Sequence, residues 1–260
     1  MTINRGERSK YFNVRYGITV DGEGEEGGTV ITIKYKGCKT VADVKAVDPN
    51  YLTNDIVDGV WSEGLGDLED VTMGVDEGMF RYSNLAAISS DLSSLQIGYN
   101  MFWGCSNLTT FDIELPSLTD GYRMFASCYN LEDFSSDLSS LTNGDNMFWN
   151  CNKLESFSSD LSSLTNGGQM FEYCNNLTTF TSDLPSLTNG STMFYSCQNL
   201  TTFTSDLPSL TKGGWMFYEC KNLTTFSSDL SSLTDGHNMF YRCSALTAFS
   251  SDLSSLTDGY

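Results

Sequence analysis

The stretch that decides the fold runs from Met193 to Trp215 and reads MFYSCQNLTTFTSDLPSLTKGGW. A 22-residue copy begins at Met79, and the other copies follow at intervals of 23 residues. Those other copies begin at Met101, Met124, Met147, Met170, Met216 and Met239. A fixed period of about 20 to 29 residues, with apolar residues at constant offsets, is typical of a solenoid in which each coil buries its core against its neighbours. The eight copies fill residues 79–260, so we expect a right-handed repeat solenoid there.

Counted from the Met of each coil, several positions do not vary after the first copy: Met and Phe at positions 1 and 2, Cys at 5, Leu at 8, Phe at 11, and Leu at 15 and 18. The spacing of three from Phe102 through Cys105 and Leu108 to Phe111 predicts a tight helical turn that leads into a short strand, with these side chains inward. Thr recurs at positions 9 and 10, on the expected exposed side of the strand. The Gly at position 21 is expected to supply a turn with positive φ.

The run MFxxCxxLTTFxSDLxSLTxG resembles the BspA-like leucine-rich repeats of bacterial and protist surface proteins. The resemblance covers residues 79–260 and implies a leucine-rich-repeat-like solenoid with a short strand and a short helical turn in each 23-residue coil. The second aliphatic residue that the family's strand usually has near position 13 is kept only as Ile113. Similar proteins act largely as adhesins and binding surfaces, so the resemblance implies a binding or adhesion role.

The N-terminal quarter has a different pattern. Alternating apolar and polar residues in 11–20 and 29–36 predict a β-hairpin around the acidic loop DGEGEEGG. Residues 38–64 combine VADVKAV, which is compatible with a short helix, with DPN, a turn signal that would end it, and their pattern assigns no fold to this stretch. We expect residues 1–65 to form a small β-rich cap or attachment module. Residues 66–260 would form the solenoid, with a degenerate coil at 66–78 before the eight coils.

The net charge of the chain disfavours some classes of partner. Lys and Arg total 14 against 33 Asp and Glu, which gives a net charge of −19 and disfavours nucleic acid and anionic membranes as partners. The chain has no apolar run of 18 residues, so we expect no membrane insertion, and no signal peptide is visible at its start. No catalytic set is apparent, because His237 is the only histidine, and no cofactor motif is found. We therefore expect a non-enzymatic protein that is extracellular, on a cell surface or on a virion.

Aromatic residues at variable positions are the candidate ligand-binding residues. If they face solvent, they form a stripe against which a glycan or a protein on a host or neighbouring surface could dock; otherwise they cover the junctions between coils as partial core. The candidates at position 3 are Trp103, Trp149, Tyr195, Tyr218 and Tyr241, and those at other positions near the coil junction are Tyr122, Tyr173 and Trp215. The alternative role is a rigid spacer in a phage or cell-surface fibre.

Two further rows follow from the repeat. Position 14 holds acidic residues that are weak calcium candidates, and the competing interpretation is that each carboxylate accepts backbone N–H groups in the next turn. The acidic row comprises Glu114, Asp137, Asp160, Asp183, Asp206, Asp229 and Asp252. Seven cysteines share position 5, and we expect buried thiols rather than disulfides, because seven is odd and stacked side chains do not readily reach disulfide geometry. The cysteines are Cys105, Cys128, Cys151, Cys174, Cys197, Cys220 and Cys243.

Overall fold

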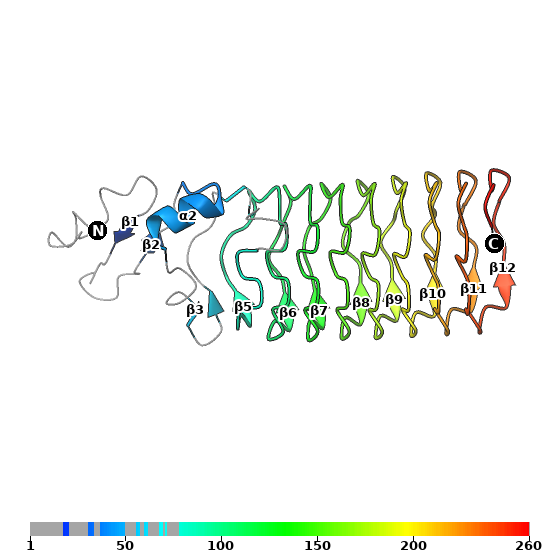
Figure 1. The fold of residues 1–260 in the computed structure, drawn as a ribbon, viewed down its shortest axis with the longest axis horizontal. Helices are drawn as coiled ribbons and strands as arrows, with labels where there is room; N and C mark the ends of the chain where they lie inside the picture. The colour runs from blue at the N-terminus through cyan, green and yellow to red at the C-terminus, as the bar shows by residue number, and fades with distance from the viewer. Residues whose placement is uncertain are drawn as a thin grey trace.

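The computed structural model describes residues 18–20, 31–33, 37–49, 56–57, 60–61, 68–69, 71 and 78–259. Two strands and one helix come first: β1 Ile18–Val20, β2 Ile31–Ile33 and α2 Val41–Val47. The later strands are β3 Ile56–Val57, β4 Val60–Trp61, β5 Ala87–Ile88, β6 Thr110–Phe111, β7 Asp133–Phe134, β8 Ser156–Phe157, β9 Thr179–Phe180, β10 Thr202–Phe203, β11 Thr225–Phe226 and β12 Ala248–Phe249. Figure 1 shows one short strand in each coil from β5 to β12, with the coils side by side along the long axis.

The N-terminal elements agree with the sequence pattern where they are described. β1 pairs antiparallel with β2, so the predicted hairpin pairing is confirmed, while the acidic loop lies outside the described residues. The short helix with which VADVKAV is compatible is present as α2. It begins after Thr40 because a capping box is present, in which Thr40 and Asp43 each bond the other's backbone N–H. Val41 and Val44 of α2 belong to the same buried cluster as the coils, and the helix lies at their N-terminal end (Figure 1).

The coils are joined by parallel strand pairing in a repeated register. Phe111 pairs with Phe134, and Phe203 pairs with Phe226, so the same positions of successive coils lie side by side. A second line of parallel bridges joins the residues at position 20, from Ile97 through Asp120 to Asp258. These observations confirm the expected repeat solenoid, in which helical turns are minor.

The first coils continue this pairing upstream. β4 pairs parallel with β5, and Glu69 accepts backbone hydrogen bonds from Gln96 and Ile97, as Gln96 does from the next coil. The described part of segment 66–78 therefore stacks as a coil does. The division into 1–65 and 66–260 stays a prediction. In the part of the chain that the structure describes, no helix has the length and apolar character needed to cross a bilayer.

The turn that precedes each strand is built by an alternation of backbone hydrogen bonds. Phe102 donates its N–H to Met124 of the next coil, whereas Trp103 donates to Asn100, three residues earlier. The alternation requires positive φ at positions 23 and 4, as at Asn100 (54°) and Ser127 (57°). Residues at these two positions are mostly unbranched at Cβ, which lowers the cost of that conformation.

The expected positive φ at the Gly of position 21 is wrong. Among the described glycines, only Gly37 and Gly104 have positive φ, and neither is at that position. The small residue is instead required by packing, because a Cβ on Gly121 would lie 2.8 Å from Sδ of Met147, which begins the coil after next. The Gly therefore makes room for the Met of position 1, a requirement that the sequence signal does not distinguish from a turn.

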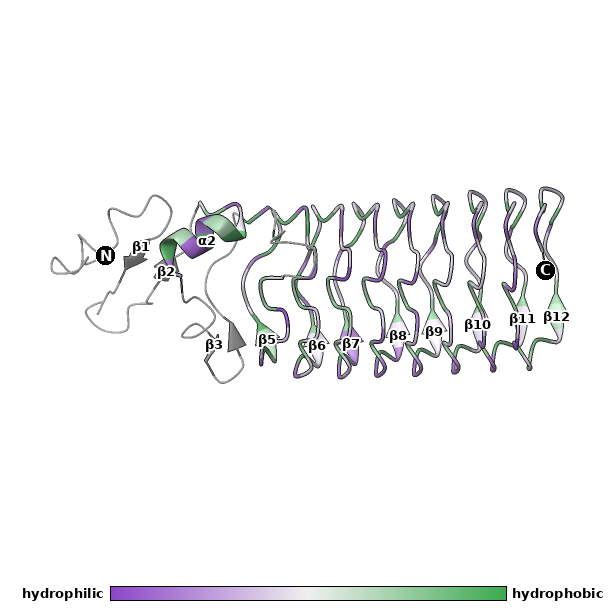
Figure 2. Cartoon of the chain, viewed as in Figure 1, coloured by the Kyte–Doolittle hydropathy of each residue, from purple (hydrophilic) through white to green (hydrophobic). Residues whose placement is uncertain are grey.

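The core of each coil consists of the invariant apolar side chains. Phe125, Phe148 and Phe171 stack with centroid separations of 5.4 Å and interplanar angles of 3° and 4°, so successive coils are nearly parallel. The thiols of position 5 are free, as predicted, and each donates to the carbonyl oxygen of a Phe at position 2; Cys151, for example, lies 3.2 Å from that of Phe125. Figure 2 shows hydrophobic and hydrophilic segments alternating around each coil.

Candidate functional site: the aromatic face

Positions 23, 3 and 4 of successive coils form one surface, which we call the aromatic face. Met and Phe at positions 1 and 2 are buried in the core, whereas most residues at positions 23, 3 and 4 are only partly buried, and a few, such as Asn100 and Ala126, are buried. Positive φ at positions 23 and 4 fixes this arch, and each arch is hydrogen-bonded to the next through backbone atoms. The side chains of the aromatic face are therefore presented on a rigid, regularly spaced frame.

A row of tyrosines occupies the C-terminal half of the aromatic face. Tyr195 and Tyr218 are stacked with their centroids 4.7 Å apart, and Tyr218 and Tyr241 are stacked at 5.2 Å. Tyr173 meets Tyr195 edge to face at 5.5 Å, although it comes from position 4 rather than position 3. These four rings, which we call the tyrosine row, are half-buried, and exposure rises to 50% for Tyr241. They thus cover the coil junctions and also keep exposed edges, which combines the two interpretations drawn from the sequence.

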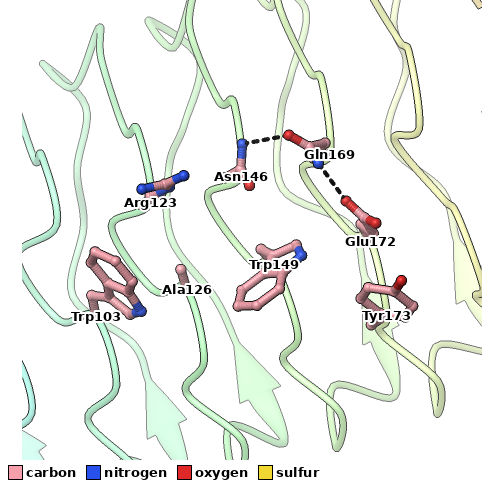
Figure 3. Close-up of a pocket in the computed structure, with 8 residues that line it drawn as sticks. All are labelled: Trp103, Arg123, Ala126, Asn146, Trp149, Gln169, Glu172 and Tyr173. Carbon is pink, nitrogen blue, oxygen red and sulfur yellow. Dashed lines mark hydrogen bonds between the residues drawn. The ribbon is translucent and has the colours of Figure 1, made fainter.

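The N-terminal half of the aromatic face is hollowed. A pocket of about 420 Å³ lies above Ala126, whose methyl group separates Trp103 from Trp149 along the line of position 3 (Figure 3). Its lining spans four coils and comprises Trp103, Arg123, Ala126, Asn146, Trp149, Gln169, Glu172 and Tyr173. Three of the eight residues predicted to bind ligand therefore meet in one pocket, and Tyr173 joins this pocket to the tyrosine row.

The upper edge of the pocket is polar and hydrogen-bonded. Nδ2 of Asn146 donates to Oε1 of Gln169 at 3.1 Å, and Nε2 of Gln169 donates to Oε2 of Glu172 at 2.7 Å (Figure 3). Burial raises the pKa of Glu172 above its ordinary value, while the hydrogen bond from Gln169 opposes the shift. Burial also raises the pKa of Asp145, which accepts a hydrogen bond from Asn146. This edge is consequently preorganised and partly dehydrated.

Arginines enclose Trp103. The guanidinium carbon of Arg81 lies 4.2 Å from the Trp103 ring centroid, and that of Arg123 lies 5.3 Å from it. Arg123 also lies 4.9 Å from the ring of Tyr122, which stacks on Tyr99 with centroids 4.9 Å apart. Tyr122 is thus linked to the pocket through Arg123. These cation–π contacts hold Arg123 in place at the pocket wall.

One candidate lies apart from these groups. The ring of Trp215 meets His237 edge to face at 4.1 Å and is 39% exposed, in a coil that does not line the pocket. The sequence reasoning did not select Arg123, Asn146, Gln169, Glu172 or Ala126, although they help to form the pocket. The available signal was the interruption of the aromatic residues of position 3 by Ala126 and Glu172.

The acidic row of position 14 has mainly local partners. The carboxylates of Asp137, Asp160, Asp229 and Asp252 each accept the backbone N–H of the Ser two residues later, at 2.8 or 2.9 Å. Hydrogen bonds from Ser139 lower the pKa of Asp137, and those from Ser231 lower the pKa of Asp229. Where Pro removes that N–H, Glu114 and Asp206 instead accept the N–H of the acidic residue in the next coil. These contacts favour the structural interpretation of the row, and its weak candidacy for calcium is left to a direct test.

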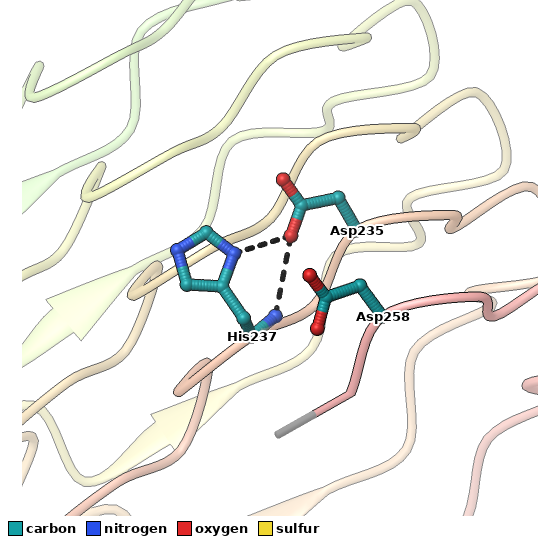
Figure 4. A group of neighbouring side chains, drawn as sticks. All are labelled: Asp235, His237 and Asp258. Atoms are coloured by element: carbon teal, nitrogen blue, oxygen red, sulfur yellow. Dashed lines mark hydrogen bonds and ion pairs between the residues drawn. The ribbon is translucent and has the colours of Figure 1, made fainter.

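A different group of ligand types lies in the last two coils. His237 contacts Asp235 through Nδ1, and ligand atoms of Asp235, His237 and Asp258 all lie within 4.8 Å of one another (Figure 4). Among the described residues, this is the one such group of three His, Cys, Asp or Glu side chains. The imidazole also packs closely against Gly214, where a Cβ would lie 2.4 Å from Cε1. Packing and the contact with Asp235 are sufficient to explain the position of His237.

The sequence was compared with known protein families and with solved structures, and it matches a family model. A family model described as the BspA type leucine-rich repeat region, with six copies, matches residues 73–201 and 171–258. No curated protein matches the sequence. A leucine-rich repeat protein from Bacteroides ovatus is 21% identical with a TM-score of 0.44, and the alignment covers 76% of this chain and 62% of that one, so this chain spans less than two thirds of its length.

Two more solved structures are similar at a lower level. A leucine-rich repeat protein from T. pallidum is 16% identical with a TM-score of 0.37, over 73% of this chain and 68% of that one. A leucine-rich cell surface protein from Faecalibacterium prausnitzii is 14% identical with a TM-score of 0.25, over 78% of this chain and 81% of that one.

Proposed function

Because the chain belongs to the BspA-type leucine-rich repeat family, we propose that it is a non-enzymatic adhesion protein whose aromatic face binds a glycan or a protein on a host or neighbouring surface. Membership in this family indicates a binding or surface role, and proteins with these repeats are generally non-enzymatic. The proposal places the chain outside the cell, on a cell surface or on a virion.

The observation that supports this proposal most strongly is the tyrosine row. Its rings contact one another along four consecutive coils at centroid separations of 4.7 to 5.5 Å, two of the contacts stacked and one edge to face, and they keep exposed edges. Rings that are held rigidly lose little conformational entropy on binding, and a tyrosine edge offers both apolar area and a hydroxyl. A row of this kind matches an extended ligand that can contact several coils at once.

The test is retention of the full chain on glycan and host-protein arrays, before and after substitution of the row. We expect Tyr195→Ala combined with Tyr218→Ala to abolish retention without lowering the unfolding midpoint by more than a few degrees. The matched control is Tyr129→Ala, because Tyr129 is 45% exposed but lies at position 6, outside the aromatic face. Unchanged retention in the double variant would contradict the proposal.

The second candidate role is a rigid spacer in a phage or cell-surface fibre. It is favoured by the nearly parallel stacking of the core, where Phe217 and Phe240 are inclined by only 3°. A spacer would show no specific retention on either array, and its ends rather than its aromatic face would determine assembly.

A further inference from the structure

We propose that the pocket above Ala126 binds one neutral pyranose ring of a glycan, stacked between Trp149 on one side and Trp103 with Arg123 on the other. The proposal deepens the adhesion role and rests on it: the pocket would recognise one sugar, while the tyrosine row contacts the rest of the ligand.

The first argument is the spacing of the coils. Neighbouring parallel strands lie about 4.8 Å apart, so Trp103 and Trp149, which are two coils apart, are separated by about 10 Å along the solenoid. A ligand ring between these two side chains would make one stacking contact with each, and two such contacts of about 5 Å also need about 10 Å. The tyrosine row shows this step directly, at 4.7 and 5.2 Å. One ring above Ala126 would therefore contact both walls.

The second argument is the size and depth of the pocket. Ala126 lines the pocket and carries only a methyl group where the coils on either side carry the indole rings of Trp103 and Trp149, so a ring bound there would lie within the aromatic face rather than on top of it. The volume of about 420 Å³ is larger than one hexose needs, and the lining extends to Tyr173, the first ring of the tyrosine row. A sugar in the pocket could therefore continue as an oligosaccharide over the tyrosine row.

The third argument is the chemistry of the upper edge. Arg123, Asn146, Gln169 and Glu172 provide charged and amide groups along one side of the pocket. A pyranose has a hydroxyl on most of its ring carbons and can replace the water that these groups lose. Asn146, Gln169 and Glu172 already hydrogen-bond one another, and an aromatic side chain, which offers at most one polar atom at its edge, would satisfy fewer of their remaining donors and acceptors than a pyranose. The edge therefore favours a sugar over a peptide ring.

The fourth argument is charge. Arg123 is cationic and Glu172 is acidic, and both face the same pocket. The raised pKa of Glu172 reflects its burial at 8% exposure, and Arg123 has Asp145 as a nearby counter-charge. Neither an anionic nor a cationic sugar would gain a surplus of opposite charge here. A neutral pyranose meets the smallest electrostatic penalty.

The experiment is a titration of the full chain with methyl pyranosides of glucose, galactose, mannose and N-acetylglucosamine, followed by tryptophan fluorescence and ligand-observed NMR. N-acetyltyrosine amide and methyl glucuronide serve as an aromatic and an anionic probe. We expect at least one neutral pyranoside to saturate with a Kd of about 1 mM or tighter, and the two comparison probes to bind at least tenfold more weakly.

The decisive variant is Ala126→Trp, which fills the pocket with the side chain that coils on both sides already have at position 3. We expect it to fold and to lose the pyranoside signal by tenfold or more in Kd. Trp149→Leu removes one wall instead and is expected to have the same effect on binding, so the test does not depend on one variant. Tyr129→Ala, at position 6 and outside the aromatic face, is the matched control and should leave the pyranoside Kd unchanged.

The possible outcomes distinguish the sugar pocket from the adhesion role. Preferred binding of N-acetyltyrosine amide or of the glucuronide would overturn the assignment of a neutral sugar. So would pyranoside binding that is unchanged in both Ala126→Trp and Trp149→Leu. Retention on an array without any pyranoside binding would overturn the pocket assignment and leave the adhesion role standing. A pyranoside signal lost in Ala126→Trp, together with silent arrays, would support the pocket and count against surface adhesion.

Discussion

The carboxylate of Glu172 accepts a hydrogen bond of 2.7 Å from the side-chain amide of Gln169, three residues earlier in the same arch of the aromatic face. Glu172 is nevertheless 8% exposed, and burial outweighs the hydrogen bond, so its pKa is raised. The stability of the fold therefore depends on the ionisation of Glu172, because the free energy needed to ionise its carboxyl is higher in the folded chain than in the unfolded chain.

The first prediction concerns this pH dependence. The folded chain binds the Glu172 proton more tightly than the unfolded chain, so the contribution of Glu172 to stability falls as pH rises from its ordinary pKa through its raised pKa. We expect Glu172→Gln to be more stable than the wild type at pH 7 and nearly equal to it at pH 4. Denaturant unfolding of both proteins at the two pH values measures the difference, and a variant that is less stable at pH 7 would contradict the shift.

The second prediction concerns the thiols. Cys151 is completely buried and its pKa is raised by that burial, whereas Cys243 is only partly buried and burial raises its pKa to about 11. At pH 8 only about one Cys243 thiol in a thousand is a thiolate, and the fraction rises about tenfold per pH unit. We expect iodoacetamide to modify Cys243 first in the native chain, about 100-fold faster at pH 10 than at pH 8. Peptide mapping checks the order, and equally fast reaction of Cys151 would contradict it.

The third prediction concerns a close backbone contact. A Cβ on Gly78 would lie 2.0 Å from the backbone carbonyl oxygen of Asn100, which cannot move without disturbing the next coil. We expect Gly78→Ala to cost about 3 kcal/mol or more. The matched control is Gly144→Ala, whose nearest obstacle is the flexible Met170 side chain at 3.0 Å, and its cost should be about 1 kcal/mol. Equal unfolding midpoints of the two variants would show that the Gly78 contact relaxes freely.

The fourth prediction concerns the phenylalanine core. Phe148 stacks on Phe125 and Phe171 at 5.4 Å and is completely buried, whereas Phe249 at the C-terminal end is 44% exposed. We expect Phe148→Ala to cost about 3–5 kcal/mol and Phe249→Ala to cost about 1 kcal/mol or less. Because each coil of a solenoid is stabilised only by the coils next to it, Phe148→Ala should also increase hydrogen exchange in the surrounding coils. Similar costs at both sites would argue against a cooperative central stack.

The fifth prediction concerns calcium and the acidic row. The carboxylate of Asp160 accepts the Ser162 N–H at 2.8 Å, so its structural role needs no cation. We expect millimolar calcium to leave the unfolding midpoint of the full chain unchanged, with magnesium as the ionic-strength control. A calcium-specific rise that disappears in Asp160→Asn would contradict this expectation and assign the row to metal binding.

The sequence by itself determined the solenoid and most of its core. Invariant Phe, Leu and Cys at fixed offsets can satisfy burial only if each coil stacks in register on the next, so the period specifies the parallel pairing of Phe111 with Phe134. The sequence of 41–47 was compatible with the helix that the structure shows, but the capping box of Thr40 and Asp43 that begins it was recognised only in the structure. Local signals could not distinguish the close packing of Gly121 against Met147 from a turn with positive φ.

Only the tertiary structure decided how the variable residues combine. Tyr173 and Tyr195 occupy different positions of their coils, and they meet because positive φ at position 4 directs Tyr173 towards the next arch. Arg123 and Glu172 lie 49 positions apart in the sequence and face one pocket because two coil steps bring them within reach. The period arises from burial, which every coil repeats, whereas the aromatic face arises from side chains that differ between coils. Its shape therefore depends on the stacking of the coils, because no single coil contains it.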